Sequence, residues 1–263
     1  MSEVRERPTS IDQHRADYQR DGAICTRKAV DPKAAQALLD HFATLPKSGD
    51  RFADDMDLYK KGIPDYWDFI APLTPLAASL MGTGSVRFYN DHLFVKPAGS
   101  QAPTRWHQDL PYWPFTGDQI IAAWIAMTPV RFEGGALQYI KGSHRRGWFF
   151  QPSEGTVPDT SDPDYLALVT PPDFFDPAER AKEEFLSWEM EPGDVLWHHS
   201  LAVHGAFANA TGASRAGLTV RFLGDDVRWD PRSYLREANA SLGKGDPLSG
   251  DPETFPLLWS ATG

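Results

Sequence analysis

The stretch from residue 215 to residue 222, Arg-Ala-Gly-Leu-Thr-Val-Arg-Phe, alternates between polar or small side chains and apolar ones. Because alternate residues of a strand point to opposite faces, Arg215, Thr219 and Arg221 share one face and the apolar residues share the other. If the apolar face packs against helices, the polar face points into a barrel, where a buried arginine needs an anionic partner. The alternative is a structural salt bridge on a solvent-facing strand. We expect Arg215 to meet an anionic ligand, and for Arg221 both interpretations stay open.

Runs of β-branched and aromatic residues between turn residues predict further strands along the chain. They cover residues 86–89, 93–95, 120–130, 136–140, 185–189 and 195–199. The run 120–130 is apolar on both alternating faces, which is typical of a strand that is buried on both sides. The sequence Glu191-Pro192-Gly193-Asp194 has proline and glycine at the positions that a type II turn prefers.

The N-terminal part, about residues 10–82, is predicted to be helical. Asp31 and Pro32 resemble an N-cap followed by proline at the first helical position, and apolar residues recur at helical spacing over 35–42. A second helix over 64–81 is interrupted by prolines. Helices followed by many short strands predict a mainly β fold, a jelly roll covered by helices, although the strand order is not fixed by these patterns.

The chain contains no internal repeat and no linker, so we expect one domain over residues 1–263. Its jelly-roll core is predicted over about 86–223, and a tail without clear periodicity over 225–263. Residues 145–180 break the strand rhythm with six prolines and many acidic residues. A connection of this length is usually a functional lid or a disordered segment, and we expect a lid that closes over a substrate.

The overall composition excludes several classes of protein. The chain has 26 Lys+Arg against 36 Asp+Glu, a net charge of −10, which argues against nucleic-acid binding. The longest apolar run, 120–127, is too short to span a bilayer, and the first twenty residues lack the apolar core of a signal peptide. Cys25 is the only cysteine, so no intrachain disulfide is possible. We therefore expect a cytoplasmic protein with no nucleic-acid or membrane partner.

Potential metal ligands stand out at two places in the sequence. His107 and Asp109 are two residues apart, so an extended backbone presents both on one face. Three later histidines, His198, His199 and His204, compete as the third ligand, and the last of them precedes a glycine that lets the chain pass close to a site. Two imidazoles and one carboxylate form the facial triad that holds non-haem Fe(II).

Aromatic residues lie close to the His-x-Asp pair in the sequence. They are Trp106, Tyr112, Trp113 and Phe115. An isolated His-x-Asp would more often be a surface pair, whereas aromatic neighbours predict a mostly apolar pocket that contains a few polar groups. A binding site for a small molecule is therefore expected at this pair.

Taken together, these motifs resemble the phytanoyl-CoA dioxygenase-like family of Fe(II)/2-oxoglutarate oxygenases over about residues 86–223. The resemblance is carried by Trp106-His107-Gln108-Asp109-Leu110-Pro111-Tyr112-Trp113, Trp124, Gly142-Ser143-His144, Pro192-Gly193-Asp194, His199, His204-Gly205, Asn209 and Arg215. The combined pattern is specific, although no single piece of it is. Within it, His199 is expected to be a structural residue, and His144 a loop residue or one that contacts a metal ligand.

The resemblance implies a fold, a metal centre and a co-substrate. The fold is a double-stranded β-helix, with Fe(II) held by His107, Asp109 and His204. Arg215 would form a salt bridge to 2-oxoglutarate, and Trp124 would line the 2-oxoglutarate pocket or else be a core aromatic.

The chain departs from the family pattern at two positions. Lys141 replaces the usual proline before Gly-Ser-His, and Ala206 replaces a small hydroxyl residue that can bind the co-substrate carboxylate. Thr219 is expected to compensate for the missing hydroxyl. Lys96, on the strand that leads to the metal motif, is either an anion contact or an exposed strand lysine.

The predicted function is an Fe(II)- and 2-oxoglutarate-dependent dioxygenase that hydroxylates an unactivated C–H bond of a small molecule. It would consume O2 and release succinate and CO2. The alternatives are desaturation or ring closure at the same site, a metal-dependent hydrolase that uses the same ligands, and a catalytically idle jelly-roll binding module. Asp109 argues against halogenation, which usually requires loss of the carboxylate ligand. Neither the prime substrate nor the oligomeric state can be read from the sequence.

Overall fold

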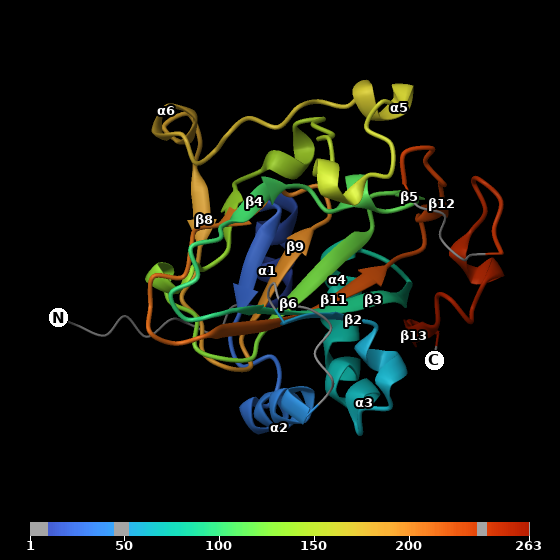
Figure 1. Ribbon diagram of the computed structural model, residues 1–263. Helices are drawn as coiled ribbons and strands as arrows, with labels where there is room; N and C mark the ends of the chain where they lie inside the picture. The colour runs from blue at the N-terminus through green and yellow to red at the C-terminus, as the bar shows by residue number, and fades with distance from the viewer. Residues whose placement is uncertain (1–9, 45–52, 236–240, 263) are drawn as a thin grey trace.

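Two antiparallel β-sheets form the centre of the molecule, for which the computed structural model describes residues 10–44, 53–235 and 241–262 (Figure 1). The larger sheet has the strand order β1-β9-β6-β11-β3-β13, and β2 also pairs with β3. Its strands are β1 Ala23–Thr26, β2 Ala53–Met56, β3 Ser85–Lys96, β6 Ile120–Ala126, β9 Val195–His199, β11 Arg215–Leu223 and β13 Leu257–Ser260.

The smaller sheet has the order β4-β10-β7-β8. Its strands are β4 Thr104–His107, β7 Gln138–Ile140, β8 Phe185–Ser187 and β10 His204–Ala206, while β5 Phe115–Thr116 and β12 Arg228–Trp229 form a separate pair. In both sheets, strands that are neighbours in space come from distant parts of the sequence. This arrangement is that of a double-stranded β-helix, as the resemblance implied.

Helices cover the sheets on more than one side. The α-helices are α1 Ile11–Asp21, α2 Pro32–Thr44, α3 Tyr66–Ile70, α4 Thr74–Met81, α5 Pro163–Leu166 and α6 Pro177–Arg180. Short 3₁₀ turns are η1 Leu58–Lys61, η2 Ala71–Leu73, η3 Leu110–Tyr112, η4 Phe132–Gly134, η5 Ser143–Arg145, η6 Glu154–Thr156 and η7 Leu248–Gly250. Figure 1 shows α2 and α3 on one side of the strands and α5 and α6 on the other. None of the helices in the described ranges has the length and apolar character needed to cross a bilayer.

The helix boundaries follow from local capping residues. Ser10 precedes α1 and its hydroxyl accepts a hydrogen bond from the backbone N–H of Gln13 at 3.1 Å. Gly22 ends this helix at φ 82°, a left-handed conformation that glycine adopts at little cost. The helix predicted from Asp31-Pro32 is α2, and the interrupted helix predicted over 64–81 is divided into α3, η2 and α4.

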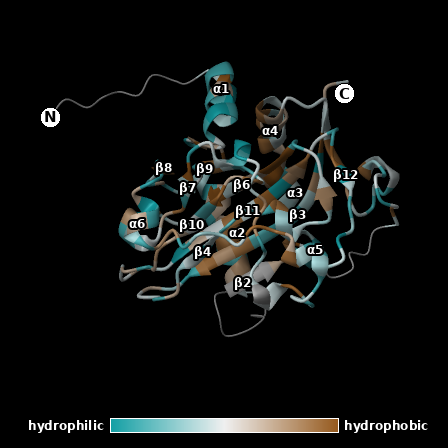
Figure 2. Ribbon diagram, turned by 90° about the horizontal axis from the view of Figure 1, so that it is seen from above, coloured by the Kyte–Doolittle hydropathy of each residue, from teal (hydrophilic) through white to brown (hydrophobic). Residues whose placement is uncertain are grey.

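The alternating pattern of β11 has the predicted consequence. Ala216, Leu218, Val220 and Phe222 are buried in one hydrophobic core with residues of α2, α3 and α4. The opposite face of the strand lines a cavity between the two sheets. Figure 2 shows the hydrophobic residues concentrated on the central strands, whereas α1 and α6 are mostly hydrophilic. The strand therefore separates the helix-covered core from the candidate site.

Two features of the larger sheet differ from the sequence predictions. The predicted strands 86–89 and 93–95 are parts of one strand, β3, which continues through the polar residues between them. There the buried carboxylate of Asp91 accepts hydrogen bonds from the backbone N–H groups of Leu58 and Tyr59 and from the hydroxyl of Tyr66, so burial of this carboxylate is compensated. The tail also contributes β13, which pairs with β3 through Leu257, Trp259 and Ser260.

The segment 145–180 packs against the strand that carries the metal motif. The side-chain amide of Gln108 donates hydrogen bonds to the carbonyls of Trp148 and Leu201, and its oxygen accepts one from the backbone N–H of Phe150. Further along, Phe174 is buried beside the smaller sheet. The segment is therefore anchored at both of its ends, and closure over a substrate stays a prediction.

Candidate metal centre and its cavity

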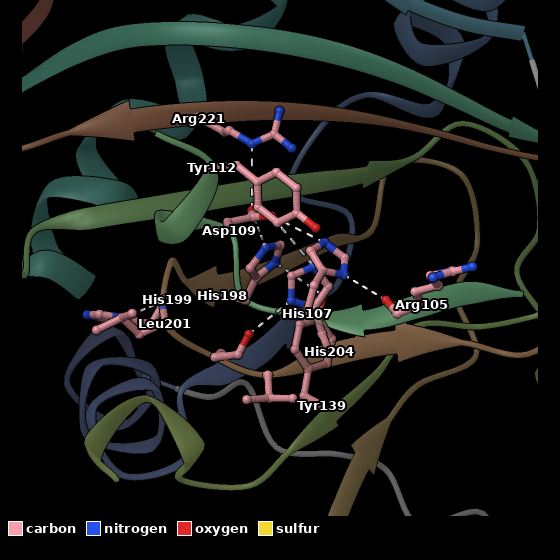
Figure 3. A network of polar contacts seen from close by, with 12 residues as sticks. Arg105, His107, Asp109, Tyr112, Tyr139, His198, His199, Leu201, His204 and Arg221 are labelled. Carbon is pink, nitrogen blue, oxygen red and sulfur yellow. Dashed lines mark hydrogen bonds and ion pairs between the residues drawn. The ribbon is translucent and has the colours of Figure 1, made fainter. Parts of the chain in front are cut away.

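The pairing of β4 with β10 brings two of the predicted ligands together. His107 ends β4, His204 begins β10, and the two residues are direct partners in the antiparallel register. Their ring centroids are 4.2 Å apart. Asp109 follows β4 and turns its carboxylate towards both rings (Figure 3). One ligand atom from each of these three residues can be chosen so that all lie within 4.8 Å of one another.

Backbone carbonyls define the tautomer of both imidazoles. The Nδ1 atom of His107 lies 2.7 Å from the carbonyl of Arg105, and that of His204 lies 2.9 Å from the carbonyl of Ala202. In each ring Nδ1–H must donate to the carbonyl, so Nε2 keeps its lone pair. Both Nε2 atoms face Oδ1 of Asp109, at 3.5 Å and 3.9 Å. The three groups are thus arranged as metal ligands with oriented donor atoms.

The electrostatic environment keeps the ligands in the states that a metal needs. Burial and the neighbouring imidazoles hold the pKa of His204 well below its usual value, so the ring is neutral. Burial alone would raise the pKa of Asp109, but the charge of Arg221 and the polar contacts with His107 and His198 hold it well below its usual range. A charged carboxylate and neutral imidazoles are the forms that coordinate a cation.

The outer oxygen of Asp109 is held by residues of the larger sheet. Oδ2 lies 3.3 Å from Nε2 of His198 and 3.7 Å from Nε of Arg221. A carboxylate only accepts hydrogen bonds, so Nε2–H of His198 donates to Asp109. In the neutral ring Nδ1 then carries a lone pair, which accepts from the hydroxyl of Tyr139 at 3.2 Å. These contacts leave Oδ1 directed towards the two ligand imidazoles (Figure 3).

His198 is a residue of the candidate site whose place was not assigned from the sequence. It was one of three competitors for the third ligand position, and the structure places it beside Asp109 instead of at the ligand position of His204. Its neighbour His199 faces the other way, with Nε2 3.1 Å from Asp118. Adjacent residues of a strand point to opposite faces, but the sequence pattern does not show which of the two faces is the inner one.

The predicted aromatic surroundings are only partly correct. The ring of Tyr112 meets His107 edge-on at 5.9 Å, and Trp113 lies 5.1 Å from the guanidinium carbon of Arg221. Trp106 instead packs against a separate hydrophobic cluster, because it precedes His107 by one residue in β4 and points to the opposite face. Phe115 likewise packs in another cluster, beside the C-terminal tail.

A cavity of about 240 Å³ opens beside the three ligands and is lined by both sheets. The predicted co-substrate residues Arg215, Trp124, Thr219 and Arg221 all lie on its wall. Arg221, however, is engaged with Asp109 and also donates to the side-chain oxygen of Asn90 at 3.1 Å. Its position favours a role in holding the metal ligand over a role in binding the co-substrate.

Arg215 is a buried cation without an anionic partner among the described residues. Its guanidinium carbon lies 5.2 Å from the ring centroid of Trp124, and its Nε has no hydrogen-bond partner. The hydroxyl of Thr219, on the same face of β11, is buried and also unpartnered. Burial lowers the pKa of Arg215 to about 10, which still leaves it charged at neutral pH. The cavity wall therefore fits an anionic ligand.

The sequence matches the family described as phytanoyl-CoA dioxygenase (PhyH) over residues 18–217. It is 31% identical over 122 residues to a probable phytanoyl-CoA dioxygenase of Caenorhabditis elegans, which covers 46% of this chain and 36% of the relative. It is 24% identical over 143 residues to a probable alpha-ketoglutarate-dependent hypophosphite dioxygenase of Stutzerimonas stutzeri, which covers 54% of this chain and 47% of the relative. The chain thus spans less than half the length of these two relatives.

Solved structures share the whole architecture. The epimerase SnoN from nogalamycin biosynthesis, in complex with Fe3+, alpha ketoglutarate and nogalamycin RO, superposes with a TM-score of 0.72 at 23% identity, covering 96% of this chain and 100% of SnoN. EctD from S. alaskensis, with 2-oxoglutarate and 5-hydroxyectoine, superposes with a TM-score of 0.67 at 18% identity, covering 93% of this chain and 88% of EctD. These likenesses confirm the predicted fold class.

Proposed function

The chain belongs to the phytanoyl-CoA dioxygenase family, and from that premise we propose that it is an Fe(II)- and 2-oxoglutarate-dependent dioxygenase. One observation carries the proposal. The ligand triad His107, Asp109 and His204 shares a cavity with Arg215, a buried cation that has no carboxylate partner among the described residues. A metal centre alone would not require such a cation, whereas a dicarboxylate co-substrate does.

The donor set suits Fe(II). Two neutral imidazole nitrogens and one charged carboxylate oxygen on one side leave further positions for other ligands. When bound, Fe(II) would supply the redox chemistry that allows O2 to react with 2-oxoglutarate and with a C–H bond. The balanced reaction is 2-oxoglutarate + O2 + R–H → succinate + CO2 + R–OH. The alpha ketoglutarate and Fe3+ in the SnoN complex support the same pair of ligands here.

The residues of the chain would bind and orient the reactants. Arg215 would hold the distal carboxylate of 2-oxoglutarate through two parallel N–H···O contacts, and the hydroxyl of Thr219 would donate to the same group. Trp124 and Leu137 also line the cavity and would exclude water from this end. Exclusion of water strengthens both polar contacts.

The solvent-exposed side of the triad indicates where a substrate would approach. The side chain of His107 is 24% exposed, whereas those of Asp109 and His204 are 8% and 7% exposed. The ring of Tyr112 lies at this open side, and its hydroxyl is 3.1 Å from Ser153 at the beginning of the predicted lid. We propose that the small-molecule substrate enters beside His107 and Tyr112, below residues 145–180.

A metal-dependent hydrolase is a weaker candidate. Zinc accepts the same three ligands, but hydrolysis gives no role to a buried Arg215. A catalytically idle binding module would need neither the oriented imidazoles nor the unpartnered guanidinium.

A cytoplasmic location, supported by the single cysteine Cys25, is part of the proposal.

The function is tested by a small-molecule screen with anaerobically reconstituted Fe(II) protein that is then exposed to O2. A true substrate should raise succinate release above the rate without substrate, and its product should gain one oxygen atom by mass spectrometry. A product that instead loses two hydrogen atoms would assign desaturation or ring closure. Absence of 2-oxoglutarate consumption, with or without any candidate, would contradict the oxygenase proposal.

Gly217 provides a separate prediction about the shape of the cavity. A Cβ atom added at this position would overlap Cζ2 of Trp124, at 1.8 Å. Gly217→Ala should therefore displace the indole, destabilise the fold by about 1–3 kcal/mol and weaken 2-oxoglutarate binding, while metal binding persists. Denaturant unfolding and a 2-oxoglutarate titration measure these effects. Gly212→Ala is the matched control, because an added Cβ there meets nothing within 4 Å; equal behaviour of the two variants would contradict the prediction.

A further inference from the structure

Lys96 is a second buried cation at the end of the cavity where Arg215 lies. It is the last residue of β3, is only 4% exposed and lines the cavity. Lys96 and Arg215 are direct partners in the antiparallel pairing of β3 with β11, and both side chains reach the same cavity. The interpretation of Lys96 as an exposed strand lysine is therefore wrong.

The ammonium group of Lys96 has no carboxylate partner among the described residues. It donates a hydrogen bond to the carbonyl of Phe207 at 2.7 Å, which leaves two of its three N–H donors for other acceptors. Asp109 is the one carboxylate among the described residues that line the cavity, and its Oδ2 is held by His198 and Arg221. The end of the cavity at Lys96 thus carries two positive charges.

We propose that Lys96 is a second anchor for the distal carboxylate of the co-substrate and that it makes the site selective for dicarboxylate over monocarboxylate 2-oxo acids. Arg215 would hold the carboxylate from β11, and Lys96 would hold it from β3. Ala206 has no hydroxyl to contribute, so the lysine would supply a contact that a hydroxyl at that position could otherwise make. This inference rests on the proposed function, because it assigns a carboxylate of 2-oxoglutarate to the ammonium group.

A purely structural role for Lys96 makes a different prediction. The lysine connects the end of β3 to the loop after β10 through Phe207, and the side-chain amide of Asn209 donates to the carbonyl of Lys96 at 3.2 Å. Lys96→Gln retains a donor for the Phe207 carbonyl but removes the charge. Lys96→Arg keeps the charge. If the lysine only supports the loop, Lys96→Gln should behave like the parent protein.

The test compares two ligands, 2-oxoglutarate and 2-oxopentanoate, which has the same chain length but no distal carboxylate. Each is titrated into anaerobic Fe(II) protein, and binding is followed by the charge-transfer absorption of the complex. Lys96→Gln should weaken 2-oxoglutarate binding by roughly tenfold to a hundredfold, the loss expected for a charge-assisted hydrogen bond. Its affinity for 2-oxopentanoate should remain that of the parent. Lys96→Arg should restore most of the 2-oxoglutarate affinity, and Lys141→Gln, at a half-buried surface lysine, is the matched control.

The pH dependence of binding provides a second readout. Burial, and to a smaller extent the charge of Arg215, lower the pKa of Lys96 to about 8. The charged group that faces the ammonium group of Lys96 is Arg215. The loop after β10 presents only the Phe207 carbonyl to the lysine side chain, and the turn before β7 presents Gly135, which has no side chain. The ammonium form binds the anion, so parent affinity for 2-oxoglutarate should fall above pH 8, by up to about tenfold per pH unit. Lys96→Gln should lack this decline.

The possible outcomes separate this inference from the function on which it rests. Selective loss of 2-oxoglutarate affinity in Lys96→Gln, with rescue by Lys96→Arg, supports the second anchor. Unchanged 2-oxoglutarate affinity, or an equal loss for both ligands, overturns it while leaving the oxygenase proposal in place. If Lys96→Gln does not fold, the same comparison is made with Lys96→Met. If the parent protein itself binds no 2-oxoglutarate, the proposed function and this inference both fail.

Discussion

His107→Ala is expected to abolish stoichiometric binding of a divalent metal. The substitution removes one of three donor atoms, and the two that remain offer a cation only one imidazole and one carboxylate oxygen. Loss of a residue that merely supports a ligand already lowers metal affinity by roughly 10–100-fold, so loss of a ligand should cost more. The fold should persist, because His107 is partly exposed and its ring lies at the open side of the cavity.

Elemental analysis of purified protein measures this effect. Fe(II) is low in the affinity order of divalent metals, so nickel, cobalt and zinc must be counted as well. His199→Ala is the matched control, because this buried histidine faces Asp118, away from the triad, and its removal should leave the metal content unchanged. Metal content in His107→Ala equal to that of the parent protein would exclude the assigned centre.

Arg215→Ala is expected to cause the largest loss of 2-oxoglutarate affinity among the cavity variants. Removal of one member of a buried charge pair typically costs about 2–5 kcal/mol, or roughly thirtyfold or more in affinity. Arg215→Lys should weaken binding less, because lysine keeps the charge but lacks the planar guanidinium with its two parallel donors. Metal binding should survive both changes, since Arg215 is not a ligand.

An anaerobic titration of 2-oxoglutarate, followed by charge-transfer absorption, provides the measurement. Arg105→Ala is the control. The side chain of Arg105 is exposed, and the residue contacts His107 through its backbone carbonyl, which the substitution keeps. If Arg215→Ala binds 2-oxoglutarate as well as the parent protein does, the arginine is structural and the co-substrate assignment loses its main support.

The parts of the fold that could be predicted are those with a strong local pattern. The alternation of residues 215–222 predicted both faces of β11, since one face is buried in the helix-covered core and the other lines the cavity. The apolar run that begins at Ile120 predicted β6, whose residues are all buried. The strand β3 was divided in the prediction because Asp91 interrupts the apolar pattern, and only tertiary hydrogen bonds make its burial possible.

The cluster of His107, Asp109 and His204 could be predicted because the first two are two residues apart and the resemblance selected His204 from three histidines. Contacts that depend on strand pairing or on the packing of the two sheets could not be predicted in the same way. The positions of His198 and Arg221 at Oδ2 of Asp109 result from the packing of β9 and β11 against the end of β4. The burial of Lys96 beside Arg215 likewise requires the pairing of β3 with β11. No single stretch of sequence contains this information.

Isotope labelling with ¹⁸O₂ tests the proposed dioxygenase activity without any knowledge of the prime substrate. Reconstituted Fe(II) protein is incubated with 2-oxoglutarate and ¹⁸O₂, and the succinate formed is analysed by mass spectrometry. We expect succinate that carries one ¹⁸O atom, in an amount equal to the CO2 released, and no succinate from His107→Ala. Absence of succinate, or succinate without the label, would contradict the assignment of this chain as a 2-oxoglutarate-dependent dioxygenase.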